Sequence, residues 1–477
     1  MRRISYIITS LIMVFSMTAI TAFAKPDWPI DTGVQSEAGI VMDMDSGAVL
    51  FAQNIHEQKI PASITKLLTA LVVIENTNDL DAPVTFSHDA IYNVESGAGN
   101  KFNLEEGDVL SVRQCLYAML LQSSNQSANA LAEYVAGSRQ AFVDMMNQRI
   151  EELGCNESHF ANPSGLNDDT QRTTAYDMAI IARACFQNPT VLEIASARTS
   201  SIPATANNPN GRTFSIEHKM LLSDDSNYYP DAIAGKTGWT SQAGQTLVTY
   251  ARREGRGQIA VTLKSTQKTH YSDTKTILDF CFAKFKNVNI ADNETEYVTG
   301  SAPVTIGAET YNPSELSIDS GAVITIPNDA QFTDANKTLE TDLPEGHPQE
   351  AVARLVYTYN ERRVGDAWIY SSSAQAVNAT PSEPGGDTPP ESRPAEDGQE
   401  GNTGFTLPRA VLIGGAVLVL ALLAGGGVFW FKRRQAAERE RQRILREKRR
   451  QRLADIGYTE EDFERLLDER RKQHDMR

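Results

Sequence analysis

Apolar and polar residues alternate in two stretches that lie far apart in the chain. The first stretch is AGIVMDMDSGAVLFAQN at residues 38–54, which alternates on both sides of an Asp45-Ser46-Gly47 turn. The second consists of QTLVTYARR and QIAVTLKS on either side of a turn at residues 254–257. Alternation with a period of two around a short turn is typical of a β-hairpin. We therefore expect two antiparallel hairpins.

Between these hairpins the spacing of apolar residues becomes helical. The runs SVRQCLYAMLLQSSNQSANALAEYVAG and AFVDMMNQRIEELG place apolar residues three and four positions apart. Gly154 is a typical helix end for the second run. Strands from both ends and helices from the middle predict an α+β fold, in which an antiparallel sheet packs against a helical subdomain. We expect this domain to span residues 25–288.

The pattern changes again after this domain. Residues 289–372 contain short β-prone runs such as GAVITIP and AVARLVYTYNERRVGDAWIYS, which predict a small β-rich C-terminal domain. Residues 373–407 are crowded with Pro, Gly, Ser, Glu and Asp. Because such a composition cannot support a hydrophobic core, we expect this segment to be a disordered linker.

Both ends of the chain have the composition of membrane-related segments. Residues 1–24 combine two arginines, an apolar run and a small-residue end at Ala24, which is typical of a signal peptide. Residues 408–431 contain AVLIGGAVLVLALLAGGGVFWF, which predicts a single transmembrane helix, with a buried core helix as the alternative. The basic tail at residues 432–477 should then be cytoplasmic, with the rest of the protein outside the cytoplasmic membrane.

Charge and cysteine content narrow the function classes. The formal net charge is −16, and the exported part is more acidic than this because the tail is basic. Such a surface argues against nucleic acid as a partner. Four cysteines in an exported chain leave one or two disulfides open, but their spacing is not that of a metal site. We expect buried thiols at Cys115, Cys155, Cys185 and Cys281.

A serine and a lysine stand at the start of an apolar helical segment, PASITKLLTALVVIEN at residues 61–76. One interpretation is a helix-start serine followed by a lysine whose ammonium reaches water. The other is a nucleophile paired with its base, because Ser63 and Lys66 share a face if the helix begins near Pro61. The local sequence alone does not separate these interpretations.

Two further tripeptides favour the second interpretation. Ser123-Ser124-Asn125 lies between two helical stretches, and Lys236-Thr237-Gly238 lies just before the second hairpin. Each tripeptide arises readily by chance. In this order, with Ser63-x-x-Lys66 and in an exported protein, the three form the motif set of serine β-lactamases and penicillin-binding proteins. The sequence resembles the serine-type D-alanyl-D-alanine carboxypeptidases, which are low-molecular-weight penicillin-binding proteins, over most of residues 35–372.

This resemblance implies an activity and a set of site residues. The enzyme would remove the terminal D-alanine from peptidoglycan stem pentapeptides through a serine acyl-enzyme, and β-lactam antibiotics would inhibit it covalently. The implied catalytic groups are Ser63 as nucleophile, Lys66 as general base and Ser123 as second catalytic hydroxyl. The implied substrate-binding residues are Lys236 for the terminal carboxylate, with Asn125, Thr237 and Gly238. No cofactor or metal is expected.

The role of Lys66 as general base requires a lowered pKa. Lys66 can accept a proton only when it is neutral, so its pKa must fall through burial and a second nearby cation. Lys236 is the obvious candidate for that cation. Two positions depart from the usual pattern of the family, Ser124 and Trp239, and Trp239 could alter the shape of the pocket. His159 is expected to be structural.

Three alternative functions share these motifs. A β-lactamase would also need a carboxylate that activates water, and the loop HFANPSGLNDDTQRTT lacks the Glu-x-x-x-Asn arrangement of that family. A membrane receptor could report acylation by a β-lactam through the basic tail. A D,D-endopeptidase would cleave cross-links instead of terminal residues. Release of D-alanine would separate a carboxypeptidase from a receptor, because a receptor would be acylated once and stop.

Overall fold

The computed structural model describes residues 25–95, 99–344 and 346–372. Four predicted segments lie outside these ranges: the signal peptide (1–24), the linker (373–407), the transmembrane helix (408–431) and the tail (432–477). Within the described residues, no helix has the length and apolar character needed to cross a membrane. All of the described residues belong to one compact unit. The domain boundary that we expect at residues 288–289 therefore stays a prediction.

A five-stranded antiparallel sheet organises the first part of the chain, with strand order β2-β1-β9-β8-β7. Its strands are β1 (Ala38–Asp43), β2 (Val49–Gln53), β7 (Ala232–Thr240), β8 (Gly244–Arg253) and β9 (Arg256–Ser265). Both predicted hairpins are confirmed, since β1 pairs with β2 and β8 pairs with β9. The chain segment before the second hairpin contributes β7, which forms one edge of the sheet.

Helices fill the middle of the sequence, as the apolar spacing predicts. They are α2 (Lys66–Glu75), α3 (His88–Tyr92), α4 (Val112–Gln122), α5 (Asn125–Ala136), α6 (Arg139–Glu152), α7 (Ala175–Gln187), α8 (Pro189–Ser196) and α9 (His270–Lys284). The side chains of Ser111, Ser124 and Ser138 cap the first amides of α4, α5 and α6. Short two-stranded sheets join β3 (Pro83–Thr85) to β4 (Val109–Ser111) and β5 (Thr199–Ile202) to β6 (Arg212–Ser215).

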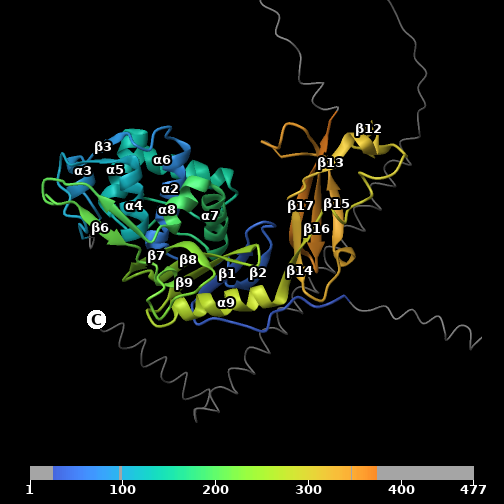
Figure 1. Cartoon of the computed structure of the whole chain (residues 1–477), viewed down its shortest axis with the longest axis horizontal. Helices are drawn as coiled ribbons and strands as arrows, with labels where there is room; N and C mark the ends of the chain where they lie inside the picture. Colours follow the sequence, from blue (N-terminus) through green and yellow to red (C-terminus); the bar gives the residue numbers. More distant parts are fainter. Residues whose placement is uncertain (1–24, 96–98, 345, 373–477) are drawn as a thin grey trace, which may run out of the picture. The chain divides into compact units, whose positions relative to one another are not determined.

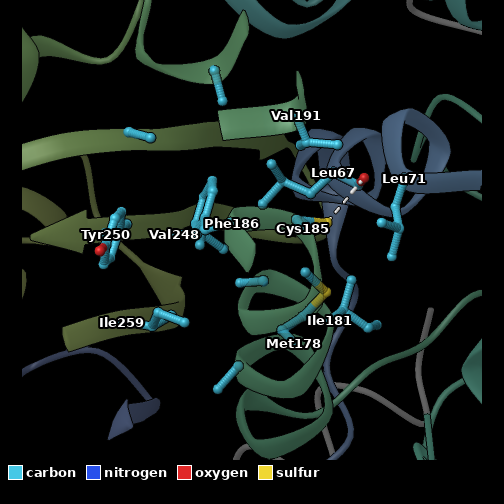
Figure 2. Packing of buried hydrophobic residues seen from close by; sticks show 14 of the residues in the cluster. Leu67, Leu71, Met178, Ile181, Cys185, Phe186, Val191, Val248, Tyr250 and Ile259 are labelled. Atoms are coloured by element: carbon cyan, nitrogen blue, oxygen red, sulfur yellow. Dashed lines mark hydrogen bonds between the residues drawn. The ribbon is translucent and has the colours of Figure 1, made fainter. Parts of the chain in front are cut away.

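The sheet has helices on both faces. Helix α9 packs along one face, and α7 and α8 pack against the other (Figure 1). Leu67 and Leu71 of α2 lie beside α7 in the buried core (Figure 2), where the Cys185 thiol donates to the Leu67 carbonyl at 3.2 Å. Phe186 and Tyr250 stack with ring centroids 5.5 Å apart. This packing fixes the start of α2 relative to the sheet.

All four cysteines are buried and free, which confirms the expectation of buried thiols. Burial raises the pKa of the Cys115 thiol and of the Cys185 thiol. A thiol in such an apolar environment is a poor nucleophile. The cysteines therefore act as small apolar groups of the core.

Short strands occupy the C-terminal part of the described chain, as expected. Strand β10 (Phe285–Asn289) follows α9 directly and pairs with β14 (Val323–Pro327), and a four-stranded sheet has the order β13-β17-β16-β15. Its strands are β13 (Leu316–Ile318), β15 (Asn336–Glu340), β16 (Ala351–Tyr359) and β17 (Arg362–Ser371). The small hairpin is β11 (Val304–Ile306) and β12 (Glu309–Tyr311). Strand β16 alternates buried and half-buried residues, so one face of this sheet covers a core.

Candidate active site

Ser63 and Lys66 meet because the chain enters α2 through a single turn of 3₁₀-helix. This turn, η1 (Ala62–Thr65), leads directly into α2. A 3₁₀-helix has three residues per turn, so side chains three apart lie above one another. The Lys66 Nζ atom is 3.0 Å from Ser63 Oγ. The prediction that the two residues share a face is confirmed.

The ammonium of Lys66 does not reach water, so the first of the two interpretations above is wrong. The side chain is fully buried. Its Nζ atom lies 2.8 Å from Asn125 Oδ1 and also donates to the backbone carbonyl of Ser164. Burial, followed by the charge of Lys236, holds the pKa of Lys66 well below its usual value.

The three contacts of Lys66 Nζ determine where its lone pair points. A neutral lysine has two N–H donors and one lone pair. The amide oxygen of Asn125 and the carbonyl of Ser164 can only accept, so they take both donors. The remaining position faces the Ser63 hydroxyl, which can donate its proton to the lone pair. The arrangement fits a general base beside its nucleophile.

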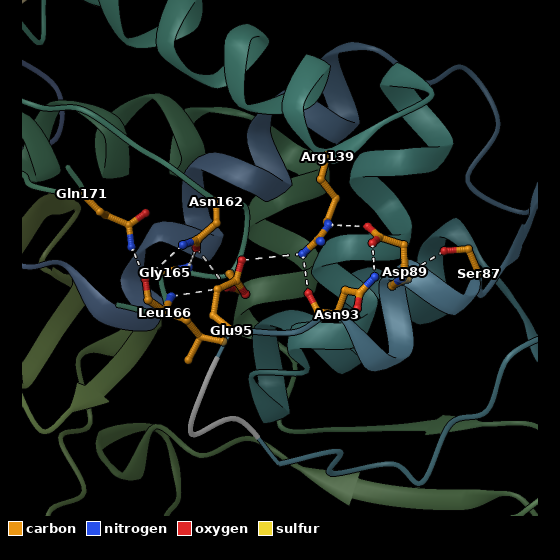
Figure 3. A network of polar contacts seen from close by, with 11 residues as sticks. Ser87, Asp89, Asn93, Glu95, Arg139, Asn162, Gly165, Leu166 and Gln171 are labelled. Carbon is orange, nitrogen blue, oxygen red and sulfur yellow. Dashed lines mark hydrogen bonds and ion pairs between the residues drawn. The ribbon is translucent and has the colours of Figure 1, made fainter. Parts of the chain in front are cut away.

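Hydrogen bonds of the Asn162 side chain hold the loop at residues 162–166 in place, and Figure 3 shows Asn162 with Gly165 and Leu166. The Asn162 Oδ1 atom accepts from Ser164 Oγ at 3.0 Å and from the Gly165 amide at 2.8 Å. The Asn162 Nδ2 atom donates to the Leu166 carbonyl at 3.0 Å. One buried side chain thus ties together the backbone on both sides of the carbonyl that contacts Lys66.

A glycine is required where this loop meets η1. Gly165 has a φ of +80°, and a Cβ atom at this position would lie 2.0 Å from the Ala62 carbonyl oxygen. Ala62 itself has a φ of 54°. An L-residue in this left-handed region costs roughly 1–2 kcal/mol, so the surrounding contacts must maintain it. The Thr65 hydroxyl provides one of them by donating to the Ala62 carbonyl at 2.9 Å.

An ion-pair network around Arg139 anchors the chain segment at residues 89–95 (Figure 3). The Arg139 guanidinium lies 2.7 Å from Asp89 and 3.6 Å from Glu95, and it donates to the Asn93 carbonyl at 2.9 Å. Arg139 belongs to α6, whereas the other three residues belong to α3 and the residues that follow it. The network therefore fixes the chain up to Glu95 against the helical region.

The third motif lies on the edge strand β7, next to η1. A Cβ atom on Gly238 would lie 2.3 Å from Thr246 Oγ1 and 2.9 Å from the Ser63 amide nitrogen, so only glycine allows this approach. The Lys236 ammonium donates to the Thr237 carbonyl at 2.8 Å. Burial lowers the pKa of Lys236 to about 8. Lys236 therefore keeps most of its charge at neutral pH and loses it as the pH rises through about 8.

The motif between α4 and α5 places Ser123 in an unusual backbone conformation. Ser123 ends α4 with a φ of 60°. Non-glycine residues in this region are enriched at functional sites. Asn125 is the first residue of α5 and faces Lys66. Neighbouring positions of one helix junction therefore present the second serine and the amide to the same space.

A cavity of about 480 Å³ opens beside Ser63. It is lined by Ser63, Gly99, Lys101, Ser123, Asn125, Leu166, Asn167, Glu217, Thr237, Gly238, Trp239, Thr240, Ser241 and Gln245. Five of the seven predicted site residues thus share one cavity wall, while Lys66 and Lys236 are buried behind it. Trp239 is 62% exposed and forms part of the rim. His159 instead pairs its backbone with Arg172, away from these residues.

Sequence reasoning missed four residues of this site. Asn162 and Ser164 had a weak local signal, the turn-forming Asn-Pro-Ser-Gly run. Lys101 and Glu217 had none, because they are separated by 116 positions in the sequence and meet only in the folded chain. Their Nζ and Oε1 atoms lie 2.5 Å apart on the cavity wall.

Comparisons with known proteins agree with the geometry. Residues 24–267 match the family model for D-alanyl-D-alanine carboxypeptidase, peptidase family S11. The chain is 30% identical over 285 residues to D-alanyl-D-alanine carboxypeptidase DacF of Bacillus subtilis strain 168, covering 58% of this chain and 71% of that protein. It is 32% identical over 308 residues to DacA of Escherichia coli strain K12, covering 62% and 71%.

A solved structure extends the similarity. The crystal structure of penicillin binding protein 6B from Escherichia coli is 26% identical, with a TM-score of 0.53, and the match covers 73% of this chain and 98% of that chain. This coverage exceeds the segment of the family model, so the similarity in fold continues beyond residue 267. The chain belongs to the D-alanyl-D-alanine carboxypeptidase family, peptidase family S11.

Proposed function

We propose that this protein removes the terminal D-alanine from peptidoglycan stem peptides that end in D-Ala-D-Ala. The reaction proceeds through an acyl-enzyme on Ser63, and β-lactams acylate the same oxygen. The observation that carries the proposal is the 3.0 Å contact between Ser63 Oγ and a fully buried Lys66 Nζ whose other partners are neutral acceptors. Membership of family S11 supports the same activity.

In the acylation step, Lys66 accepts the hydroxyl proton while Ser63 Oγ attacks the carbonyl carbon of the penultimate D-alanine. The developing oxyanion faces the Ser63 amide at the start of η1, and the Trp239 amide of strand β7 serves as the second donor. The C–N bond then breaks. Ser123 relays a proton to the departing amine, so D-alanine leaves as a neutral amine that takes up a further proton in solution.

In the second half of the reaction, water attacks the ester carbonyl and the C–O bond to Ser63 breaks. The products are the shortened peptide acid and the regenerated serine. The edge position of β7 supports binding of the stem peptide, because an extended peptide can pair with the free edge of the strand beside Ser63. Gly238 keeps this edge clear of side chains, and Thr237 offers a hydroxyl on the cavity wall.

D-alanine release tests the proposal directly. The full chain should release D-alanine repeatedly from a peptide ending in D-Ala-D-Ala, and fluorescent penicillin should label it covalently. Ser63→Ala should abolish both signals. Ser272→Ala, at an exposed serine of α9, is the matched control and should leave both unchanged. Labelling without turnover would instead favour a receptor, and labelling that survives Ser63→Ala would overturn the proposed nucleophile.

The location of the protein is a second part of the proposal. Residues 1–24 act as a signal peptide, residues 408–431 anchor the chain in the cytoplasmic membrane, and residues 432–477 lie in the cytoplasm. The support is the apolar run and the basic residues that follow it. External protease on wall-stripped cells should remove residues 25–372 and spare the tail. Digestion of the tail without lysis would reverse this topology.

A further inference from the structure

Two charged residues stand on the cavity wall among the described residues, Lys101 and Glu217. Their Nζ and Oε1 atoms lie 2.5 Å apart, and their side chains are 41% and 34% exposed. Lys236, in contrast, is 1% exposed and directs its ammonium to the Thr237 carbonyl. The cation that can meet a ligand inside the cavity is therefore Lys101.

The Glu217 end of the ion pair lies near both the second and the third motifs. The Glu217 amide donates to the Leu121 carbonyl at 3.0 Å, near the end of α4 at which Ser123 is placed. The next residue, His218, packs against Gly235, which directly precedes the third motif, so that a Cβ atom there would lie 2.7 Å from the imidazole. The backbone at Glu217 and His218 thus connects the regions of the second and third motifs.

Neighbouring residues hold the backbone of Lys101, while its side chain is 41% exposed. The Arg212 guanidinium donates to the Lys101 carbonyl and lies over the ring of Phe102. The Asn208 amide donates to the Phe102 carbonyl at 2.6 Å. A half-exposed lysine–glutamate pair is weak in water, so exchanging Glu217 for another carboxylate has a small free-energy cost.

We propose that Lys101 determines specificity for a free C-terminal carboxylate. The Lys101 ammonium turns from Glu217 to the carboxylate of the departing D-alanine when a substrate enters, and Glu217 returns the ammonium to its resting position when the cavity empties. Thr237, Thr240 and Ser241 line the same cavity, and their hydroxyls can donate to the second carboxylate oxygen. This inference rests on the proposed function, because it concerns the leaving group of that reaction.

The test compares two substrates in the full chain, an acyl-D-Ala-D-Ala with a free carboxylate and its C-terminal amide. Lys101→Met should lower kcat/KM for the free acid about 10- to 100-fold, chiefly through KM, because a charge-assisted contact is lost. At a pH above the acidic limb of acylation the amide should be unaffected, whereas below it loss of the Lys101 charge also raises the pKa of Lys66 for both substrates. Lys59→Met, which removes a lysine that pairs with Glu37 and Glu57 outside the cavity, is the control and should change neither substrate.

The Glu217→Gln variant, compared on the same two substrates, gives a second test. If Glu217 competes with the substrate for Lys101, this variant should lower KM for the free acid several-fold. If the pair only braces the cavity wall, Lys101→Met and Glu217→Gln should instead lose activity together and with both substrates, which would overturn the inference. Melting temperatures of both variants identify loss of folding. If the wild-type chain releases no D-alanine, the proposed function fails as well, whereas an active wild type with an unchanged Lys101→Met refutes this inference alone.

Discussion

Lys66 near the sheet edge and Glu294 in the β-rich region are both buried ionisable groups, but their partners differ. Lys66 contacts three neutral oxygens, those of Ser63, Asn125 and Ser164. Glu294 is 3% exposed at its side chain and accepts from the Lys337 ammonium and the Tyr357 hydroxyl, both at 2.8 Å. One buried group thus lacks an opposite charge, and the other has one.

The pKa values follow this difference. Burial raises the pKa of Glu294, but hydrogen bonds from Lys337, from the Glu296 amide and from Tyr357 outweigh burial and leave the pKa lowered. Burial and the charge of Lys236 hold the pKa of Lys66 well below its usual value, and the charges of Glu217 and Glu95, which act in the opposite direction, do not outweigh them. A countercharge therefore makes a buried ion structural, whereas its absence makes a buried amine a free base.

Removing the Lys66 ammonium, which has no countercharge, should have the largest effect of these changes. It should slow acylation far more than it changes stability. We expect Lys66→Met to slow acylation by penicillin roughly 10³- to 10⁴-fold, near the upper end for loss of a general base. Stability should change by no more than about 1–2 kcal/mol, because removal of a desolvated amine offsets much of the cost of leaving Asn125 Oδ1 and the Ser164 carbonyl without their donor. Stopped-flow labelling measures the acylation rate, and thermal unfolding measures the stability. A large loss of stability with fast acylation would contradict the comparison.

The loop that presents the Ser164 carbonyl to Lys66 gives the next test. Gly165→Ala should destabilise the fold by roughly 3–5 kcal/mol and also slow acylation, because the new methyl group collides with the Ala62 carbonyl. Gly154 is the matched control: its φ is +77°, but a Cβ atom there meets nothing within 4 Å.

Gly154→Ala should therefore cost only about 1–2 kcal/mol for its backbone conformation and leave acylation unchanged. Urea unfolding of both variants measures the difference. Equal losses of stability would mean that the contact with Ala62 is not decisive.

Breaking the compensated pair should affect stability alone. We expect Glu294→Ala to destabilise the protein by about 2 kcal/mol, less than for a fully buried pair, because Lys337 is 31% exposed and water can solvate its ammonium. D-alanine release at a temperature well below unfolding should be unchanged. Glu309→Ala, at an exposed position of β12, serves as the control. A loss of turnover in folded Glu294→Ala would show that the two sites are coupled.

The smallest expected effect is a shift in pH dependence. Acylation requires neutral Lys66, so its rate rises with pH through the pKa of Lys66. Lys236→Met removes a repelling cation, so Lys66 should hold its proton more tightly and the acidic limb should move to higher pH.

The shift should fade above about pH 8, where Lys236 of the wild type loses its own charge. A substrate with an amidated C-terminus separates this effect from carboxylate binding. Lys275→Met, at an exposed position of α9, is the control. An acidic limb that stays in place for both substrates would mean that the charge of Lys236 does not lower the pKa of Lys66, which burial and the charge of Lys101 would then have to explain.

Much of the fold was predictable because its signals are local. The two hairpins, the helical middle and the short strands after α9 follow from the spacing of apolar residues. The contact between Ser63 and Lys66 was also predictable, since three positions of one helical turn separate them. The four cysteines were correctly expected to be buried thiols, because their spacing is not that of a disulfide scaffold or a metal site.

The sequence by itself therefore determined the secondary structure, the three motifs and the order in which they occur. Only the tertiary structure decided what surrounds the base and which cation reaches the cavity. The Ser164 carbonyl is 98 positions from Lys66, and Lys101 is 116 positions from Glu217. Burial and electrostatic effects act through space, so no local pattern records them. A lysine is a surface charge or a catalytic base according to what the folded chain places beside it.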